Sequence, residues 1–292
     1  MFTATLIAAD ALNEGDVSAL ADRLAASGAS SVSRHWIEPG SACDLGFEGD
    51  PLAARTVLEG AVSSIDVIVQ KTAESRRRLI VADMDSTMIT VECIDELADY
   101  AGIKPQIAEV TERAMRGELD FEAALRSRVA LLKGLPESAI EQCLAERVRI
   151  MPGARELVGT IRANGGHAVL VSGGFTRFTA PVAAEIGFDR AVSNTLGIVD
   201  GFLDGTVTGE IVGATAKKDT LAATLAAKGW QVAEALAVGD GANDIPMIEV
   251  AGLGVAYHAK PKTAAAADGC VRHGDLTTIL YAMGYSRADW VG

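Results

Sequence analysis

Four short apolar runs constrain the fold of this chain more than any other feature. They read LIVA, AVLV, ALAV and LGVA, and they begin at Leu79, Ala168, Ala235 and Leu253. A strand that is apolar on both faces is typical of a parallel sheet covered by helices on both sides. Helical patterns separate the runs, so the sequence predicts an α/β domain with a doubly wound, Rossmann-like parallel sheet.

Two further segments interrupt this alternation of strands and helices. Residues 91–150, between the first two runs, have apolar residues at helical spacing and are too long for one crossover. We therefore expect an inserted helical cap there. Residues 189–211 contain Asp200-Gly201 and Asp204-Gly205 between β-rich stretches, and such pairs are typical of hairpin turns.

The first 71 residues have a different pattern. It predicts the order β-α-β-β-α-β, with strands at residues 3–8, 31–37, 45–47 and 65–69 and helices starting near residues 16 and 51. This is the order of a small α+β, ferredoxin-like domain. The polar stretch 71–78 reads as a linker. We therefore predict two domains, residues 1–72 and residues 73–292.

Charge and cysteine content exclude several classes of protein. The 292 residues include 26 Lys and Arg against 39 Asp and Glu, a formal net charge of −13. An acidic surface repels phosphate backbones, so nucleic acid is not an expected partner. The sequence has no basic leader and no run of about 18 apolar residues, so we expect neither a secreted nor a membrane protein. Its four cysteines form no CxxC pair, which favours a reducing cytoplasm over a disulfide or zinc framework.

Acidic side chains follow two of the four apolar runs. Asp83 and Asp85 come directly after the first run, and the GDGAND segment after the third supplies two further carboxylates, Asp240 and Asp244, and the amide of Asn243. The carboxyl ends of parallel strands are where α/β sheets bind ligands. Carboxylates that meet there repel one another unless a cation or a shared proton intervenes, and oxygen ligands suit Mg²⁺. A helix cap or a tight acidic turn would explain either segment taken alone.

The second run ends in Ser172 and Gly173, where a hydroxyl and free backbone N–H groups at a helix start can hold a phosphoryl group. Lys217 or Lys218 can add positive charge, although an ordinary turn and a solvated lysine pair would give the same letters. Together with the carboxylates, these residues predict phosphoryl transfer through an aspartyl-phosphate. No GxxxxGK[ST] or strand-linked GxGxxG motif supports nucleotide-driven transfer.

The segments DMDST, SGG, Lys217 and GDGAND occur in the order of the four motifs of the haloacid dehalogenase superfamily of phosphohydrolases. Within it, residues 79–283 resemble the phosphoserine phosphatase family nearly end to end, including DMDSTMITVECIDELA, AMRGELDFEAALRSRVALLKGL, VSGGF and VGDGANDIPMI. The resemblance implies that Asp83 is the nucleophile and that Asp85 is the general acid and base. It also implies a Mg²⁺ ion bound by the Asp83 and Asp240 side chains and the Asp85 backbone carbonyl.

The same resemblance implies how the phosphoryl group is held. Ser172, the Gly173 N–H group and Lys217 would contact its oxygens, with Asn243 nearby. Lys217 is preferred to Lys218 because it aligns better with the AK pair of the family.

The predicted cap carries the remaining candidate residues. Arg128 falls among the apolar positions of one helix face and needs an anionic partner, which a substrate carboxylate or an intramolecular Glu would supply. The resemblance assigns Arg128 to a substrate carboxylate and Glu92 to a substrate ammonium. It assigns Met115 and Phe121 to closure of the pocket, although ordinary cap core would also explain both.

The resemblance as a whole implies Mg²⁺-dependent hydrolysis of O-phospho-L-serine to L-serine and phosphate, the last step of L-serine biosynthesis. Alternatives within the superfamily are phosphate transfer to homoserine and hydrolysis of a broader set of small phosphomonoesters. The element order of residues 2–71 resembles that of ACT domains, which implies a homodimer and leaves amino-acid sensing as a further alternative.

Overall fold

The computed structural model of the chain describes residues 1–72, 76–116 and 118–292, without the side chain of Met115. Its strands are β1 (Phe2–Ala8), β2 (Ser30–Glu38), β3 (Ala42–Glu48), β4 (Ile65–Lys71), β5 (Leu79–Ala82), β6 (His167–Phe175), β7 (Arg190–Val199), β8 (Phe202–Thr208), β9 (Ala235–Gly239), β10 (Leu253–Tyr257) and β11 (Gly269–Val271). Its α-helices are α1 (Glu14–Ala26), α2 (Pro51–Leu58), α3 (Cys93–Tyr100), α4 (Lys104–Met115), α5 (Phe121–Leu131), α6 (Ser138–Glu146), α7 (Ala154–Ala163), α8 (Thr176–Ile186), α9 (Ala214–Lys228), α10 (Ile245–Ile248), α11 (Pro261–Ala266) and α12 (Thr278–Ala282).

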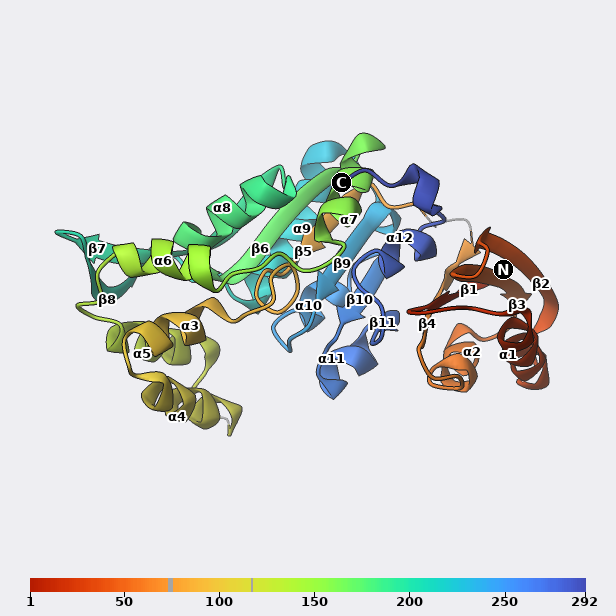
Figure 1. Cartoon of the computed structure of the whole chain (residues 1–292), viewed down its shortest axis with the longest axis horizontal. Coiled ribbons are helices and arrows are strands. Elements are labelled where there is room, and N and C mark those ends of the chain that lie inside the picture. Colours follow the sequence, from red (N-terminus) through yellow and green to blue (C-terminus); the bar gives the residue numbers. More distant parts are fainter. Residues whose placement is uncertain (73–75, 117) are drawn as a thin grey trace.

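The described strands form one continuous sheet along an elongated molecule. Their order is β2-β3-β1-β4-β11-β10-β9-β5-β6-β7-β8. Figure 1 shows β1–β4 at one end of the molecule and helices α3–α6 at the other.

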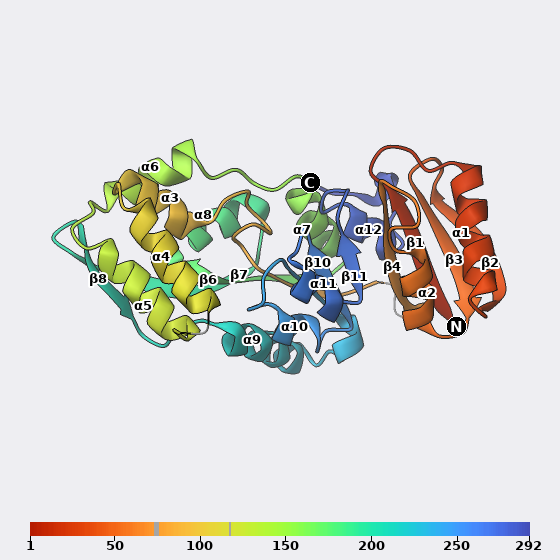
Figure 2. The same cartoon turned by 90° about the horizontal axis from the view of Figure 1, so that it is seen from below.

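The predicted parallel sheet forms the middle of the molecule. β5 pairs in parallel with β6 on one side and β9 on the other, so Ala82 lies opposite both Leu170 and Val238. Side chains of β5 alternate between two cores, because Ile80 packs with residues of α7, α8 and α12, whereas Val81 packs with residues of α9 and α10. Helices therefore cover both faces of the sheet (Figure 2), and the prediction of a doubly wound α/β fold is confirmed.

β6 is longer than the apolar run from which it was predicted. It continues through Ser172 and Gly173 to Phe175, with a register shift against β7. The SGG segment therefore belongs to the end of the strand, as the sequence predicted, but it does not reach the helix start that the sequence also predicted there. Helix α8 begins only at Thr176.

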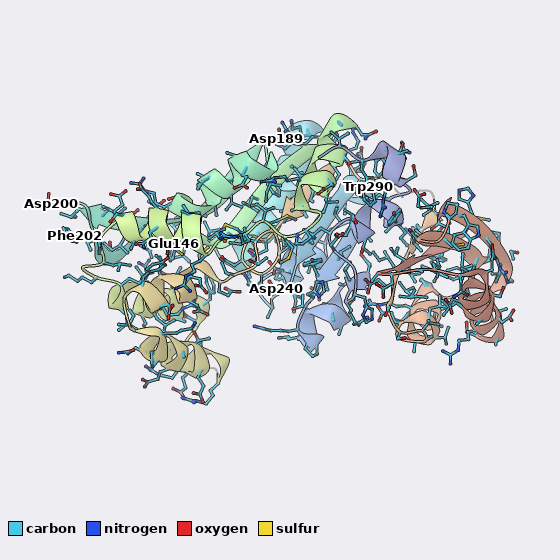
Figure 3. All side chains as sticks on the ribbon, in the orientation of Figure 1. Glu146, Asp189, Asp200, Phe202, Asp240 and Trp290 are labelled. Carbon is cyan, nitrogen blue, oxygen red and sulfur yellow. The ribbon has the colours of Figure 1, made fainter. Side chains whose placement is uncertain are left out.

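The predicted hairpin is formed by β7 and β8, with its tip near Asp200 and Phe202 (Figure 3). Asp200 and Gly201 have φ values of 53° and 80°, which suit a tight hairpin turn. The Asp204-Gly205 pair lies within β8 instead, where Asp204 Oδ1 accepts a hydrogen bond from Thr206 N at 2.7 Å. Only the first of the two predicted turns is therefore a turn.

The predicted cap corresponds to α3–α6, which lie between Cys93 and Glu146. Its two connections to the core are bound to each other by the Ile89–Ile150 bridge. The hydrogen bond from Met151 N to Met88 O, at 2.9 Å, closes the base of the cap.

Strands β1–β4 with α1 and α2 form what we call the N-terminal unit, which has its own apolar core and the predicted element order. The sequence did not predict β11, whose antiparallel pairing with β4 joins this unit to the core sheet. The predicted linker includes residues 73–75, which lie outside the described residues. Its Arg77 is buried and donates to Gln70 Oε1 at 2.9 Å. The division into two domains remains a prediction.

No helix in the described part of the chain is long and apolar enough to cross a membrane. The four cysteines are buried and free.

Candidate active site

The loop after β5 carries the first two predicted carboxylates. Asp83 is buried, and its N–H group donates to Val238 O at 3.0 Å, which fixes this loop against β9. Asp85 Oδ1 accepts from Cys93 N at 3.1 Å, at the start of α3. The strand therefore directs one carboxylate to the core loops and the other to the base of the cap.

Lys217 enters the site from α9 and is completely buried. Its Nζ atom lies 2.6 Å from both Asp83 Oδ1 and Asp244 Oδ1. Burial alone lowers the pKa of this ammonium, but the two carboxylates outweigh burial and raise the pKa above its ordinary value. The neighbouring Lys218 is exposed. Of the two lysines that the sequence offered as candidates, only Lys217 therefore reaches the carboxylates.

Three carboxylates form a cluster that can hold a metal ion. The ligand oxygens of Asp83, Asp240 and Asp244 lie within 4.8 Å of one another. A set of oxygen ligands alone suits Mg²⁺ rather than Zn²⁺. Thr87 Oγ1 donates to Asp240 Oδ1 at 3.3 Å and helps to orient that carboxylate. The donor set therefore fits the predicted ion.

Asp244 is the member of this cluster that sequence analysis did not single out. It is completely buried at the start of α10, and a Cβ atom at Gly239 would overlap its carboxylate. The signal was present as the second aspartate of GDGAND, but spacing alone does not show that this aspartate faces Asp83. The side chain of Asp85 lies outside the cluster. This agrees with the prediction in that only the backbone carbonyl of Asp85 was expected to bind the ion.

Burial raises the pKa of three carboxyl groups in the site, and Asp83 is one of them. Burial raises the pKa of Asp85 to about 7, with a further contribution from the negative charge of Glu92. Burial, Asp244 and Glu92 raise the pKa of Asp240 to about 6. Asp85 is therefore suited to hold and release a proton near neutral pH.

The SGG segment lies beside Asp85. Ser172 is buried, and its Oγ atom accepts from Gly174 N at 2.8 Å. A Cβ atom at Gly174 would lie 3.0 Å from Asp85 Oδ2, which shows how closely the two segments approach.

The buried Asn194 holds the SGG segment from behind. Its Nδ2 atom donates to Gly173 O at 2.8 Å, and its Oδ1 atom accepts from Val212 N at 2.8 Å. Sequence analysis missed this residue, because no motif distinguishes one asparagine in a strand from another.

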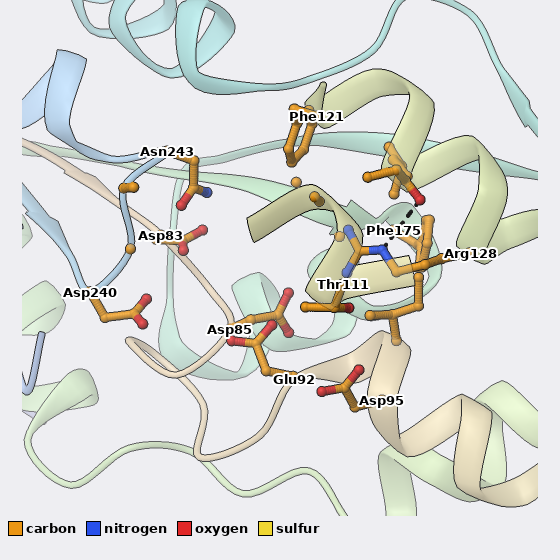
Figure 4. Close-up of a pocket in the computed structure, with 18 of the residues that line it drawn as sticks. Asp83, Asp85, Glu92, Asp95, Thr111, Phe121, Arg128, Phe175, Asp240 and Asn243 are labelled. Atoms are coloured by element: carbon orange, nitrogen blue, oxygen red, sulfur yellow. Dashed lines mark hydrogen bonds between the residues drawn. The ribbon is translucent and has the colours of Figure 1, made fainter. Parts of the chain in front are cut away.

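A cavity of about 520 Å³ joins the core loops to the cap (Figure 4). The predicted site residues that line it are Asp83, Asp85, Glu92, Phe121, Arg128, Gly173, Asp240 and Asn243. Ser172 and Lys217 are completely buried and are not among its lining residues. Met115 belongs to α4, but its side chain is outside the described part of the chain.

Arg128 is a half-buried cation in the wall of this cavity. Its Nε atom donates to Ala124 O at 3.4 Å, and no ion pair joins it to any residue in the described ranges. Burial lowers the pKa of its guanidinium, whereas the nearby Asp95 and Glu92 oppose that shift. The intramolecular salt bridge that sequence analysis left open is therefore absent from the described residues, and the guanidinium faces a space that can take an anion.

Two cap side chains approach the core loops. Glu92 Oε1 accepts from Ser86 Oγ at 2.9 Å, which holds the carboxylate at the cavity wall. Phe121 lies against two glycines of the core, since a Cβ atom at Gly173 or at Gly213 would lie 3.1 Å from its ring. The cap thus contacts the SGG segment through an aromatic ring.

The model of the haloacid dehalogenase-like hydrolase family matches residues 80–249. The chain belongs to this family. It is 46% identical to the phosphoserine phosphatase of Streptomyces coelicolor, over 84% of this chain and 60% of that protein. It is 50% identical to the phosphoserine phosphatase of Vibrio cholerae, over 69% of this chain and 61% of that protein.

A crystal structure of a probable phosphoserine phosphatase from Vibrio cholerae has the same overall architecture as this chain. The TM-score is 0.79 at 36% sequence identity, over 98% of this chain and 88% of that chain. The chain spans about three fifths of the length of the two curated relatives.

Proposed function

We propose that this protein is a Mg²⁺-dependent phosphoserine phosphatase that hydrolyses O-phospho-L-serine to L-serine and phosphate. The observation that carries this proposal is one cavity with two sets of groups in its wall. Asp83 and Asp85 suit phosphoryl transfer, while Arg128 and Glu92 suit the carboxylate and ammonium of an amino acid. The phosphoserine phosphatases among its relatives support the same substrate.

In the first step, the Asp83 carboxylate attacks the phosphorus atom of the substrate. The bond between phosphorus and the serine oxygen breaks, and Asp85 donates its proton to that oxygen, which leaves as the serine hydroxyl. The raised pKa of Asp85, about 7, supports its protonated state at this step. The products of the step are L-serine and a phosphoryl group bound to Asp83.

In the second step, water attacks the phosphorus atom of the Asp83-bound phosphoryl group. Asp85, now ionised, accepts a proton from this water, and the bond between phosphorus and Asp83 breaks. Inorganic phosphate leaves, and both carboxyl groups return to their starting states.

Lys217 and the SGG segment provide the electrostatic setting for both steps. Lys217 Nζ contacts Asp83 Oδ1 at 2.6 Å, so it orients the nucleophile and opposes the negative charge of the phosphoryl oxygens. We assign the Ser172 hydroxyl and the Gly173 N–H group as further donors to the phosphoryl oxygens. Asp83, Asp240 and the Asp85 backbone carbonyl would hold Mg²⁺, with Asp244 completing the carboxylate cluster. When bound, the ion supplies Lewis-acid stabilisation of phosphoryl charge.

The test is phosphate release from O-phospho-L-serine, with and without Mg²⁺ and EDTA, measured beside phosphothreonine, phosphohomoserine and p-nitrophenyl phosphate. We expect a large preference for O-phospho-L-serine that disappears with EDTA and in Asp83→Asn. Comparable rates on all four esters would keep the chemistry of Asp83 and reject the specificity. No release from any ester would reject the proposal and favour an amino-acid sensor.

We further propose that the N-terminal unit is ACT-like, that the protein is a cytoplasmic homodimer, and that its reaction completes L-serine biosynthesis. The β-α-β-β-α-β order supports the first point. Light scattering on the full chain, with and without L-serine, tests assembly and ligand binding. A monomer that does not change with L-serine would reject the homodimer and give no support to sensing.

A further inference from the structure

Asp66, on β4 of the N-terminal unit, binds a turn of the catalytic core. It is 3% exposed, and its carboxylate accepts from the backbone N–H groups of residues 272–274. The shortest of these contacts, to Arg272 N and Gly274 N, are 2.8 Å long. These residues begin the segment 272–277 between β11 and α12, which we call the junction turn.

The junction turn also contacts the segment where the cap returns to the core. Leu276 N donates to Pro152 O at 3.2 Å, directly after the bridge that closes the base of the cap. The next residue, Gly153, has φ 80°, and a Cβ atom there would lie 2.6 Å from Thr277 N. The turn therefore packs so closely on this connection that only glycine fits.

A second contact of the junction turn leads to the wall of the cavity. His258 Nε2 donates to Gly274 O at 3.0 Å, and His258 N donates to Val271 O at 2.8 Å. These bonds hold His258 at φ 43°, an uncommon conformation for a residue other than glycine. Two residues later, Lys260 lines the cavity, and its N–H group donates to Asp240 O at 3.3 Å.

The N-terminal unit also holds the helix that follows Lys260. Arg55 Nη2 donates to Ala264 O at 2.9 Å, and Arg55 Nη1 donates to Ala267 O, at the end of α11. Two side chains of the N-terminal unit, the buried Asp66 and the half-buried Arg55, thus bind backbone that follows the β10–α11 connection, in the junction turn and at the end of α11.

We propose that Asp66 is a positioning residue for the active site. Through the junction turn it fixes both the cap connection at Gly153 and the cavity wall at Lys260. The N-terminal unit lies at the opposite end of the molecule from the cap (Figure 1), so this contact couples two distant parts of the chain. Any ligand or partner that shifts β4 would change the cap and the cavity through the same turn.

The test compares Asp66→Asn with Asp44→Asn in the full chain. The matched control removes a carboxylate that accepts from Thr5 Oγ1 at 2.7 Å within the N-terminal unit. Hydrogen exchange by mass spectrometry reports on residues 152–160, 258–260 and 272–277. We expect faster exchange in all three segments for Asp66→Asn and wild-type exchange there for Asp44→Asn.

The kinetic arm of the test rests on the proposed function. We expect Asp66→Asn to raise KM for O-phospho-L-serine about threefold to tenfold, with a smaller change in kcat. A mutation in a packed network that links two sites changes ligand affinity by about this factor. Loss of activity in the parent protein would count against the proposed function alone, since the exchange arm does not use the substrate.

Faster exchange confined to residues 272–277, with unchanged KM, would overturn the proposal. So would equal effects of Asp66→Asn and Asp44→Asn, since these would reflect general loosening of the N-terminal unit. If Asp66→Asn does not fold, Gly274→Ala perturbs the turn from the core, because the new Cβ atom would overlap Thr278 Oγ1. Faster exchange at 152–160 and 258–260 in that variant would support the coupling, and unchanged exchange would overturn it.

Discussion

The Lys217 ammonium lies between two carboxylates in a part of the site without solvent exposure. Removing water from three charges costs free energy, which their short contacts at 2.6 Å offset. An arrangement of this kind is balanced only while all its members are present. If the ammonium is removed, two buried carboxylates face each other without a counter-charge.

Lys217→Met should therefore lower the free energy of unfolding by about 3 kcal/mol and abolish turnover. Urea denaturation and phosphate release measure the two effects. The control is Lys218→Met at the exposed neighbouring position, which should change stability by less than about 0.5 kcal/mol. Equal losses in both variants would contradict the buried-charge explanation.

Arg128→Ala should reduce kcat/KM for O-phospho-L-serine about 100-fold, as expected when one partner of a desolvated charge pair is removed. The loss with p-nitrophenyl phosphate, which has no carboxylate, should be much smaller. Steady-state kinetics on both esters measure the difference. Arg126→Ala is the control on the same helix, because Arg126 pairs with Glu122 at the exposed surface. Equal losses of Arg128→Ala on both esters would remove Arg128 from the carboxylate role.

The apolar runs were enough to place Asp83 and Asp240 at the ends of β5 and β9. Their position at a strand end follows from the local pattern. Asp244 was noted as a carboxylate of GDGAND but was given no role, and Asn194 was not predicted, because the contacts of both residues depend on the chain segments that they face. A buried carboxylate and a buried asparagine are identified as site residues only when tertiary contacts are known.

At the scale of elements, the cap contacts the core through one aromatic ring, that of Phe121, which packs against the backbone of core glycines. Phe121, at the start of α5, lies over Gly173 and Gly213 from two different core segments. Side chains at these two positions would hold the ring away from the SGG segment. The two glycines therefore set how closely the cap approaches the SGG segment.

Gly213→Ala should raise KM for O-phospho-L-serine, because its Cβ atom would lie 3.1 Å from the Phe121 ring and push the cap outward. Phe121→Leu provides a shorter side chain in the same place. We expect the effects of the two changes to be non-additive in the double variant, as for residues in contact. Additive effects in this cycle would contradict direct contact as the cause.

Element type followed well from periodicity, whereas element ends and partners did not. The four apolar runs gave β5, β6, β9 and β10, because fully buried strands need apolar residues on both faces. β11 has only three residues, too few for a periodic signal. Its pairing with β4 depends on how two units meet, which local sequence does not encode.

At the scale of the whole molecule, one sheet passes from β4 of the N-terminal unit through β11 into the parallel strands of the core. β4 pairs with β11, and Ile68 of β4 is completely buried against the larger core cluster. The N-terminal unit therefore shares hydrogen bonds and apolar contacts with the core. This arrangement favours joint unfolding over separate unfolding of two tethered domains.

Urea unfolding of the full chain should accordingly show one transition. Trp36 reports on the N-terminal unit, and Trp230 reports on the core next to Arg78. In variants that lack Trp290 and keep only Trp36 or only Trp230, the fluorescence midpoint should coincide with the circular dichroism midpoint of the same variant. An early transition seen only through Trp36 would contradict joint unfolding.

Asp83 is the residue that we propose accepts the phosphoryl group of O-phospho-L-serine. The most direct measurement is acid quenching of the enzyme within one turnover with Mg²⁺ and substrate, followed by peptide mass spectrometry. We expect an acid-stable, hydroxylamine-sensitive phosphoryl group on the peptide that contains Asp83, and none in Asp83→Asn. Rapid phosphate release without any phosphorylated Asp83, or phosphorylation of another residue, would contradict this role of Asp83.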